Sequence, residues 1–248
     1  MADWSLSDAY TDQKADTIGL EIGPTLYEYL MKESDFATTI QNLRKSVLQE
    51  RGVYLPAVRI KTGSAEEPNR YIIRIRGRRV ADGDLYPPLR FSERHVSDRP
   101  AIHPMKRIEG YWTENEGETA REIITAHLRH VLHSRVDELF TYELAVRWLK
   151  QARSHIPELV DELKERGMTP GLLWSVVKIL LRDRVPIHPF EELLENILDY
   201  YISHPPQGYA PPGWTHPHPE SIAKFIAEKR KRRIPAKKDT GNVIGFVK

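Results

Sequence analysis

The stretch from Thr119 to Tyr201 limits the possible folds most, because its apolar residues recur at the three- and four-residue spacing of amphipathic helices. This spacing predicts helices over about 119–135, 141–154, 157–165, 170–182 and 190–202. We therefore expect a compact helical subdomain over residues 119–203. Its predicted core is formed by Trp148, Leu149, Leu173, Val177, Leu180 and Leu194.

The residues before this stretch mix strand and helix patterns. Residues 17–23 alternate apolar and polar and predict a strand, and a single apolar face over about 35–51 predicts a helix. Residues 71–76 are rich in β-branched and aromatic side chains and predict a strand, and after a turn at Gly77 a further strand is expected at 78–81. The order strand, helix, strand, strand indicates a small α/β subdomain.

The whole chain is thus predicted to be an α+β multi-subdomain protein. A flexible N-terminal arm at 1–15 precedes the α/β subdomain at 16–118, which leads into the helical subdomain. Within the α/β subdomain, the region around residues 89–110 has little regular pattern, and short strands are expected near Leu89–Phe91. Residues 204–248 are expected to form a proline-rich segment, a short helix at about 220–232 and a basic tail.

The C-terminal segment supplies the candidate interaction residues. Six prolines between Ser203 and Pro219 exclude a regular helix or a central strand there. Such a segment is stiff, and its aromatic side chains gain by lying on another surface, either on its own helical subdomain, which we favour, or on a neighbouring subunit. The candidate protein-interaction residues are Tyr209, Trp214, Arg230, Arg232 and Arg233.

The sequence contains no pattern typical of an enzyme or a cofactor site. It has no cysteine, no phosphate-binding glycine loop, no nucleophile elbow and no apolar run long enough to cross a bilayer. His127, His130 and His133 share one predicted helix and suggest a metal site, but His127 falls within an apolar stripe, where a core histidine is the commoner explanation. We expect no catalytic residues, no cofactor, no metal and no small-molecule substrate.

An alternative function rests on local positive charge, since the formal net charge is only +2. Residues 229–233 read Lys-Arg-Lys-Arg-Arg, and arginines recur along the strand from Arg74 to Arg79. Together they allow a nucleic-acid-binding regulator. Cations at the end of an exposed helix and on the solvated face of a strand are the commoner explanation, so nucleic acid is the weaker hypothesis.

Several segments, taken in order, resemble the cytoplasmic domain of the FHIPEP family of flagellar and type III secretion export gates. They are Leu20–Gly23, Ile40–Ile60, Asn69–Gly77, Ala126–Leu139, Pro157–Leu163, Leu180–Ile187 and Leu194–Leu198. Two departures are clear. The family's inserted subdomain is shortened here to about residues 89–110, with Asp98–Ala101 and Trp112 as its remnant, and its usual last subdomain is missing.

The resemblance implies a non-enzymatic protein-export component. Such domains form a homo-oligomeric ring beneath the export channel and receive protein substrates, chaperones, or channel and ATPase components of the apparatus. The resemblance also implies a cytoplasmic location at the inner face of a bacterial membrane, reached through a segment missing here or through a partner. No chaperone-docking residue of the family is carried over, because the motif that holds such residues is absent.

Overall fold

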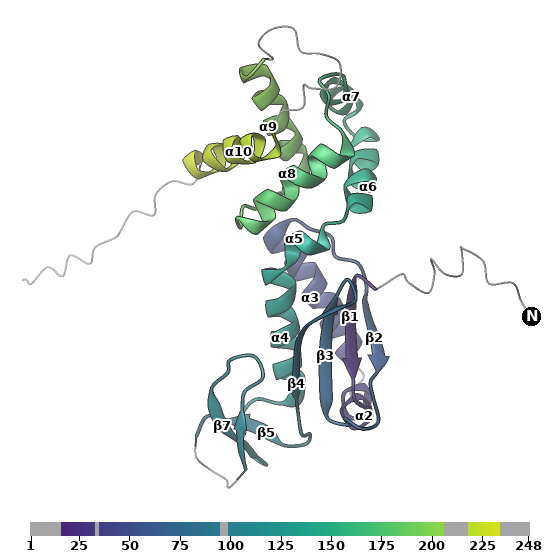
Figure 1. The fold of residues 1–248 in the computed structure, drawn as a ribbon, viewed down its shortest axis with the longest axis vertical. Coiled ribbons are helices and arrows are strands. Elements are labelled where there is room, and N and C mark those ends of the chain that lie inside the picture. Colours follow the sequence, from purple (N-terminus) through teal and green to yellow (C-terminus); the bar gives the residue numbers. More distant parts are fainter. Residues whose placement is uncertain (1–15, 33–34, 95–98, 206–217, 234–248) are drawn as a thin grey trace, which may run out of the picture.

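The computed structural model describes residues 16–32, 35–94, 99–205 and 218–233. The molecule is elongated, with the larger sheet and its helices in one half and a group of helices in the other (Figure 1). This mixed architecture confirms the predicted α+β fold class. No helix among the described residues is long and apolar enough to cross a membrane.

The larger sheet is built around β1 (Ile18–Ile22). In the described residues its strand order is β2-β1-β3-β4. β2 (Val58–Thr62) is parallel to β1, β3 (Arg70–Ile75) is antiparallel to β1, and β4 (Arg78–Asp84) is antiparallel to β3. Alternate side chains of β1 and β3 point into the core, and the register pairs Leu20 with Ile73. Each of these two side chains is fully buried.

Two helices accompany this sheet. Helix α3 (Phe36–Arg51) was predicted, and it ends at Gly52, whose φ of 76° is the left-handed value that glycine adopts without strain. Helix α2 (Pro24–Lys32) was not predicted. Pro24, two residues after the end of β1, occupies the first position of this helix, where its fixed φ is favourable.

Helix α4 (Ala120–Ser134) begins with a capping box, in which Thr119 and Glu122 exchange side-chain and backbone hydrogen bonds. It lies beside the larger sheet and α3 (Figure 1). The short helix α5 (Val136–Leu139) follows. The first helix of the predicted helical subdomain thus packs in the α/β half, while the boundary at residue 118 stays a prediction.

Three short strands, which follow β4 in the chain, form a second, smaller sheet. Its strand order in the described residues is β5-β7-β6, from β5 (Arg90–Ser92), β7 (Glu109–Thr113) and β6 (Pro100–Ile102). The expected strand near Leu89–Phe91 is present as β5. Strands of three residues are too short to leave a periodic signal in the sequence.

The other half of the molecule contains α6 (Tyr142–Arg153), α7 (Pro157–Glu165), α8 (Pro170–Arg182), α9 (Phe190–Ser203) and α10 (Pro219–Arg233). Helix α8 is the hub, because α5, α6 and α10 all pack on it. Four of the six predicted core residues are fully buried: Leu173, Val177, Leu180 and Leu194. Trp148 and Leu149 are only partly buried, since α6 is an outer helix that turns its alanines, Ala145 and Ala152, inward.

Candidate docking surfaces

A cleft of about 570 Å³ separates the end of β4 from the small sheet. Its walls carry exposed apolar side chains: Ile102 on the edge strand β6 is 62% exposed, and Tyr86 is 44% exposed. Exposed apolar groups of this size are a mark of interaction sites when they gather in one hollow. The residues lining this docking cleft are Asp82, Gly83, Asp84, Tyr86, Leu89, Arg99, Pro100, Ala101, Ile102, Pro104, Arg107 and Trp112.

Aromatic packing holds the floor of the docking cleft in place. The Trp112 ring meets Tyr86 edge-on at 5.5 Å and Phe91 edge-on at 5.7 Å between centroids. Phe91 in turn packs against the His103 ring at 4.9 Å. These edge-to-face contacts favour one arrangement of the small sheet, so the cleft is preformed in the unbound protein.

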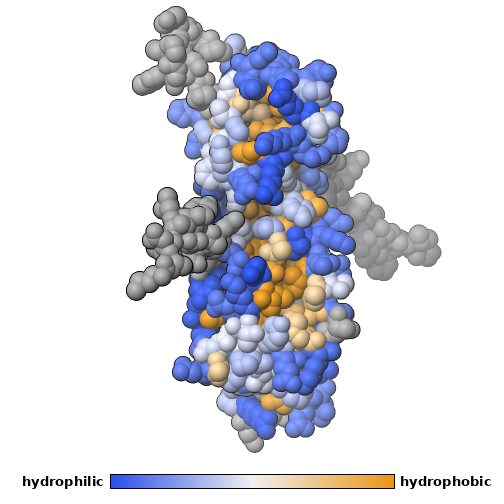
Figure 2. All heavy atoms as spheres, turned by 90° about the vertical axis from the view of Figure 1, so that its right-hand side faces the viewer, coloured by the Kyte–Doolittle hydropathy of each residue, from blue (hydrophilic) through white to orange (hydrophobic). Residues whose placement is uncertain are grey.

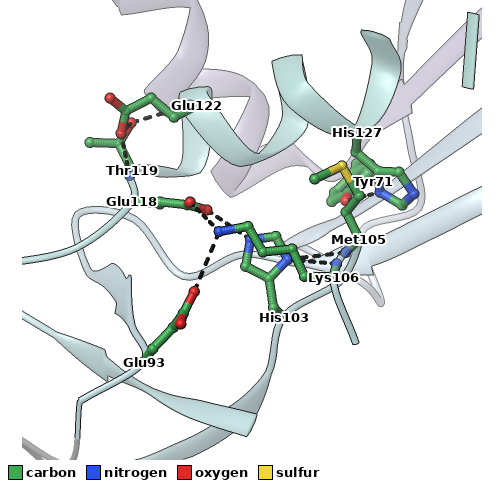
Figure 3. A network of polar contacts seen from close by, with 9 residues as sticks. All are labelled: Tyr71, Glu93, His103, Met105, Lys106, Glu118, Thr119, Glu122 and His127. Carbon is green, nitrogen blue, oxygen red and sulfur yellow. Dashed lines mark hydrogen bonds and ion pairs between the residues drawn. The ribbon is translucent and has the colours of Figure 1, made fainter. Parts of the chain in front are cut away.

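A polar network fixes the same region from behind (Figure 3). The His103 ring is fully buried, and its Nδ1 accepts hydrogen bonds from the backbone N–H groups of Met105 and Lys106. Its Nε2 lies 2.8 Å from Glu118 Oε2, so Nε2 carries the proton and donates to that carboxylate. Lys106 also pairs with Glu118 and lies 3.5 Å from Glu93.

Glu118 therefore joins the small sheet to the start of α4. Although burial alone raises the pKa of Glu118, hydrogen bonds from Lys106 and His103 hold that pKa below its ordinary value. The carboxylate stays ionised and keeps both contacts. The network is a structural tie, and each of its members already has a partner within the chain.

A second buried pair connects α4 to the sheet. The hydroxyl of Tyr71 on β3 lies 2.7 Å from Nδ1 of His127 on α4, and the two rings meet edge-on. The buried hydroxyl has no other acceptor among the described residues, so it donates to Nδ1, and Nε2 of His127 carries the proton. Burial, helped by the charge of His130, lowers the pKa of His127 to about 4. Burial also raises the pKa of Tyr71. At neutral pH both groups are uncharged, which the sequence-based interpretation of His127 as a core histidine anticipated.

The three histidines of α4 do not converge on one point. His127 bonds to Tyr71, His133 lies 3.5 Å from Glu50 of α3, and His130 is exposed. Among the described residues, no group of three or more histidine, aspartate or glutamate side chains could hold a metal ion.

A second hollow, of about 750 Å³, lies where α3 meets the helical half. Leu48, which is 41% exposed, and the partly buried Trp148 and Phe190 give this junction groove an apolar lining. The Trp148 and Phe190 rings meet edge-on at 4.8 Å. The half-burial of Trp148, which departs from the predicted core, follows from its place in this groove.

Figure 2 shows hydrophobic surface in the middle of the face on which strand β2 forms the edge of the larger sheet. Val58 and Ile60 of this strand are half-buried, and they alternate with the exposed Arg59 and Lys61. Asp16 pairs with Lys61 at 2.7 Å. Apolar groups therefore reach the surface at several places along the molecule, and the docking cleft holds the most exposed of them.

The candidate residues from the C-terminal segment are placed only in part. Tyr209 and Trp214 lie outside the described residues. Arg232 and Arg233 belong to the last turn of α10, and Arg230 donates from Nη1 to the carbonyl oxygens of Pro186 and His188. Their role in binding a partner stays a prediction.

The basic features behind the nucleic-acid hypothesis make contacts within the chain. Arg74 forms a two-pronged ion pair with Glu21 at 2.7 and 3.2 Å, and Arg79 pairs with Asp82 at 2.7 Å. Lys229 pairs with Asp199. Charges that are matched at close range contribute little to a long-range field, so this alternative is not favoured.

Sequence reasoning missed the docking cleft itself. Its residues come from the end of β4, the Tyr86–Leu89 turn, β6 and β7, which are separate in sequence. The one available signal was the presence of Trp112 and Tyr86 in a proline-rich region without helical periodicity, where an aromatic side chain has no helix face on which to be buried.

Comparison with known proteins assigns this architecture to a class. The sequence profile of the FHIPEP family matches residues 4–207, so the chain belongs to the FHIPEP family. The flagellar biosynthesis protein FlhA of Escherichia coli K12 is 25% identical over 212 residues. FlhA of Buchnera aphidicola subsp. Schizaphis graminum is 28% identical over 207 residues. These alignments take in 76% and 75% of this chain but only 30% of each relative, so the chain spans about a third of their length.

Solved structures share the fold at low sequence identity. The Chlamydia pneumoniae CdsV protein aligns with a TM-score of 0.69 and 17% identity, over 91% of this chain and 67% of that one. The nonameric EPEC SctV-C assembly gives a TM-score of 0.63 and 14% identity, over 89% and 67%. The C-terminal domain of InvA gives 0.59 and 20%, over 87% and 66%. The recognised family resemblance is thus confirmed in both sequence and fold.

Proposed function

We propose that this protein is a non-enzymatic component of a protein-export apparatus. It acts in the cytoplasm, at the inner face of a bacterial membrane, as a platform on which protein substrates, chaperones or other export partners dock, and its copies assemble into a ring. Membership of the FHIPEP family and similarity to FlhA support this role. Among its structural neighbours, SctV-C is nonameric and CdsV forms a complex with a second protein, CdsO.

The observation that carries the proposal is the docking cleft, with Ile102 exposed on an edge strand. An edge strand can pair its free backbone groups with an extended segment of a partner, while an adjacent apolar hollow takes up the partner's side chains. Among the described residues β6 pairs on one side only, with β7, and the hollow lies beside it. Pro100 has no N–H to donate, so the apolar hollow supplies more of the contact than the strand edge does.

The charges around the docking cleft also suit a protein partner. Asp82 and Asp84 stand on one side, and Arg99 and Arg107 belong to the other lining segments. Hydrogen bonds from Arg79 and Arg70 outweigh burial and hold the pKa of Asp82 below its ordinary value. Charged side chains of both signs thus surround an apolar centre, which is a usual composition of a protein–protein interface. This mixture of charges gives no preference for a polyanion such as nucleic acid.

Replacing the chromosomal copy with Ile102→Asp should reduce the export of proteins that depend on this component. A charge placed in the centre of an apolar contact costs more than about 1.4 kcal/mol, which lowers partner affinity at least about tenfold. Ile202→Asp is the matched control, because Ile202 is 57% exposed on α9, away from the docking cleft. The measurement is quantitative mass spectrometry of proteins outside the cell.

Deletion of the whole chain should abolish export of the same proteins. If deletion leaves every exported protein unchanged, the export role is wrong. If deletion has an effect but Ile102→Asp behaves as Ile202→Asp does, the export role stands and the docking cleft is not where partners bind.

A further inference from the structure

Helix α10 covers an apolar face of the hub helix α8 and of α9, and only residues 206–217 connect it to them. Ile222, Ala223 and Ile226 of α10 are at most 2% exposed. Phe225 meets the Tyr200 ring edge-on at 5.6 Å. All of these apolar contacts fall in the first half of α10, so the α8/α9 face is a groove for a short amphipathic helix.

Polar contacts fix how a helix lies in this groove. Lys229 pairs with Asp199 of α9, and Arg230 donates to the carbonyl oxygens of Pro186 and His188 just before α9. The groove therefore accepts a helix whose apolar residues come first and whose basic residues follow. Helix α10 has that pattern, and so does the α10 of any other copy of this chain.

The connection to α10 is much longer than the gap it crosses. The rings of His204 and Phe225 lie 5.8 Å apart, and His218 precedes Phe225 by seven residues. With a helical rise of 1.5 Å per residue, the connection has to span a gap of roughly 15–20 Å. An extended chain from residue 204 to residue 218 reaches about 46 Å, which is enough to reach a neighbouring molecule.

We propose that the α8/α9 face is an interface between copies of this chain, in which α10 of one copy occupies the groove of the next. The helix makes the same contacts on its own chain and on a neighbour, so the balance depends on the connection alone. This exchange does not require the export role.

The length of the connection sets the protein concentration at which exchange occurs. A connection of this length gives α10 an effective concentration of about 1 mM or more at its own groove. At about 10 μM the helix stays on its own chain, and near 1 mM, or wherever copies are held side by side, up to about half of the helices are exchanged. Exchange therefore links neighbours within an assembly without any new contact surface.

Disulfide trapping between two differently tagged copies tests this proposal, since the chain has no cysteine of its own. One copy carries Asp199→Cys and the other Lys229→Cys, at positions that pair in the structure. The copies are mixed at about 1 mM and at about 10 μM, with time for exchange, and then mildly oxidised. A disulfide between the two tagged copies, mapped by mass spectrometry, requires α10 of one copy to lie in the groove of the other.

We expect the mixed disulfide at about 1 mM to exceed, by roughly tenfold, that obtained when Lys224→Cys replaces Lys229→Cys. Lys224 is exposed on the same helix and reports random collision. A single chain with both Asp199→Cys and Lys229→Cys should close within itself at about 10 μM. If that chain closes but the mixed copies give no more product than the Lys224→Cys control, exchange is excluded. If it does not close, the groove assignment itself is wrong.

Discussion

Between pH 6.5 and pH 4, the free energy of unfolding of this protein should fall by about 2–3 kcal/mol more than that of a His127→Asn variant. In the unfolded chain His127 takes up a proton near its ordinary pKa of 6.5, whereas in the folded protein burial lowers that pKa to about 4. The unfolded state thus binds more protons across this window, so stability is full above pH 6.5 and is lost as the pH falls towards 4.

Asparagine at position 127 keeps an acceptor for the Tyr71 hydroxyl, because its Oδ1 falls near the place of the histidine Nδ1. It cannot be protonated, so the difference between the two curves isolates His127. His130→Asn removes the exposed histidine one turn further on and should keep most of the wild-type fall, because burial is the larger cause of the lowered pKa of His127. Urea unfolding at half-unit steps of pH is the measurement, and parallel curves for wild type and His127→Asn would rule out the buried neutral imidazole.

Gly117→Ala should disrupt the small sheet and the docking cleft, at a cost of about 2–4 kcal/mol. Gly117 has a φ of 111°, and a Cβ there would lie 2.1 Å from the carbonyl oxygen of Phe91. To relieve this clash, the backbone at position 117 has to move away from Phe91. Phe91 and Glu118 are joined by two backbone hydrogen bonds of 2.8 Å, and these would be lost.

Hydrogen exchange of backbone amides shows which parts of the protein the Gly117→Ala substitution destabilises. Amides of β5 and β7 should lose protection in Gly117→Ala, while those of α8 keep it. Asn115→Ala, an exposed change in the same turn, should leave both regions unchanged. Unaltered protection of β7 in Gly117→Ala, with unfolding within about 0.5 kcal/mol of wild type, would show that the turn can adapt and that the close approach to Phe91 does not limit it.

The long elements of this fold could be predicted because their burial is periodic. Helix α8 turns Leu173, Val177 and Leu180 towards the core at a regular spacing, and β3 alternates about Tyr71 and Ile73. Short elements could not be predicted in this way. The three-residue strands of the small sheet carry no period, and α2 begins at Pro24, a residue type that commonly marks a turn or the end of an element.

The docking cleft was harder to predict than the fold, because it is a tertiary feature. Ile102, Trp112 and Asp84 come together only after β7 pairs with β6 and the small sheet packs near the end of β4. No local sequence pattern predicts which of these segments come into contact. The basic residues that the sequence did single out, Lys229 and Arg230, bind within their own chain in the described structure.

Photo-crosslinking from position 102 in living cells tests the central claim most directly. A photoreactive amino acid in place of Ile102 should capture proteins identified by mass spectrometry as exported substrates, their chaperones or components of the export apparatus. The same amino acid in place of Ile202, which is 57% exposed against 62% for Ile102, should not capture them. Capture of the same proteins from both positions, or from position 102 of proteins unrelated to export, would contradict the account.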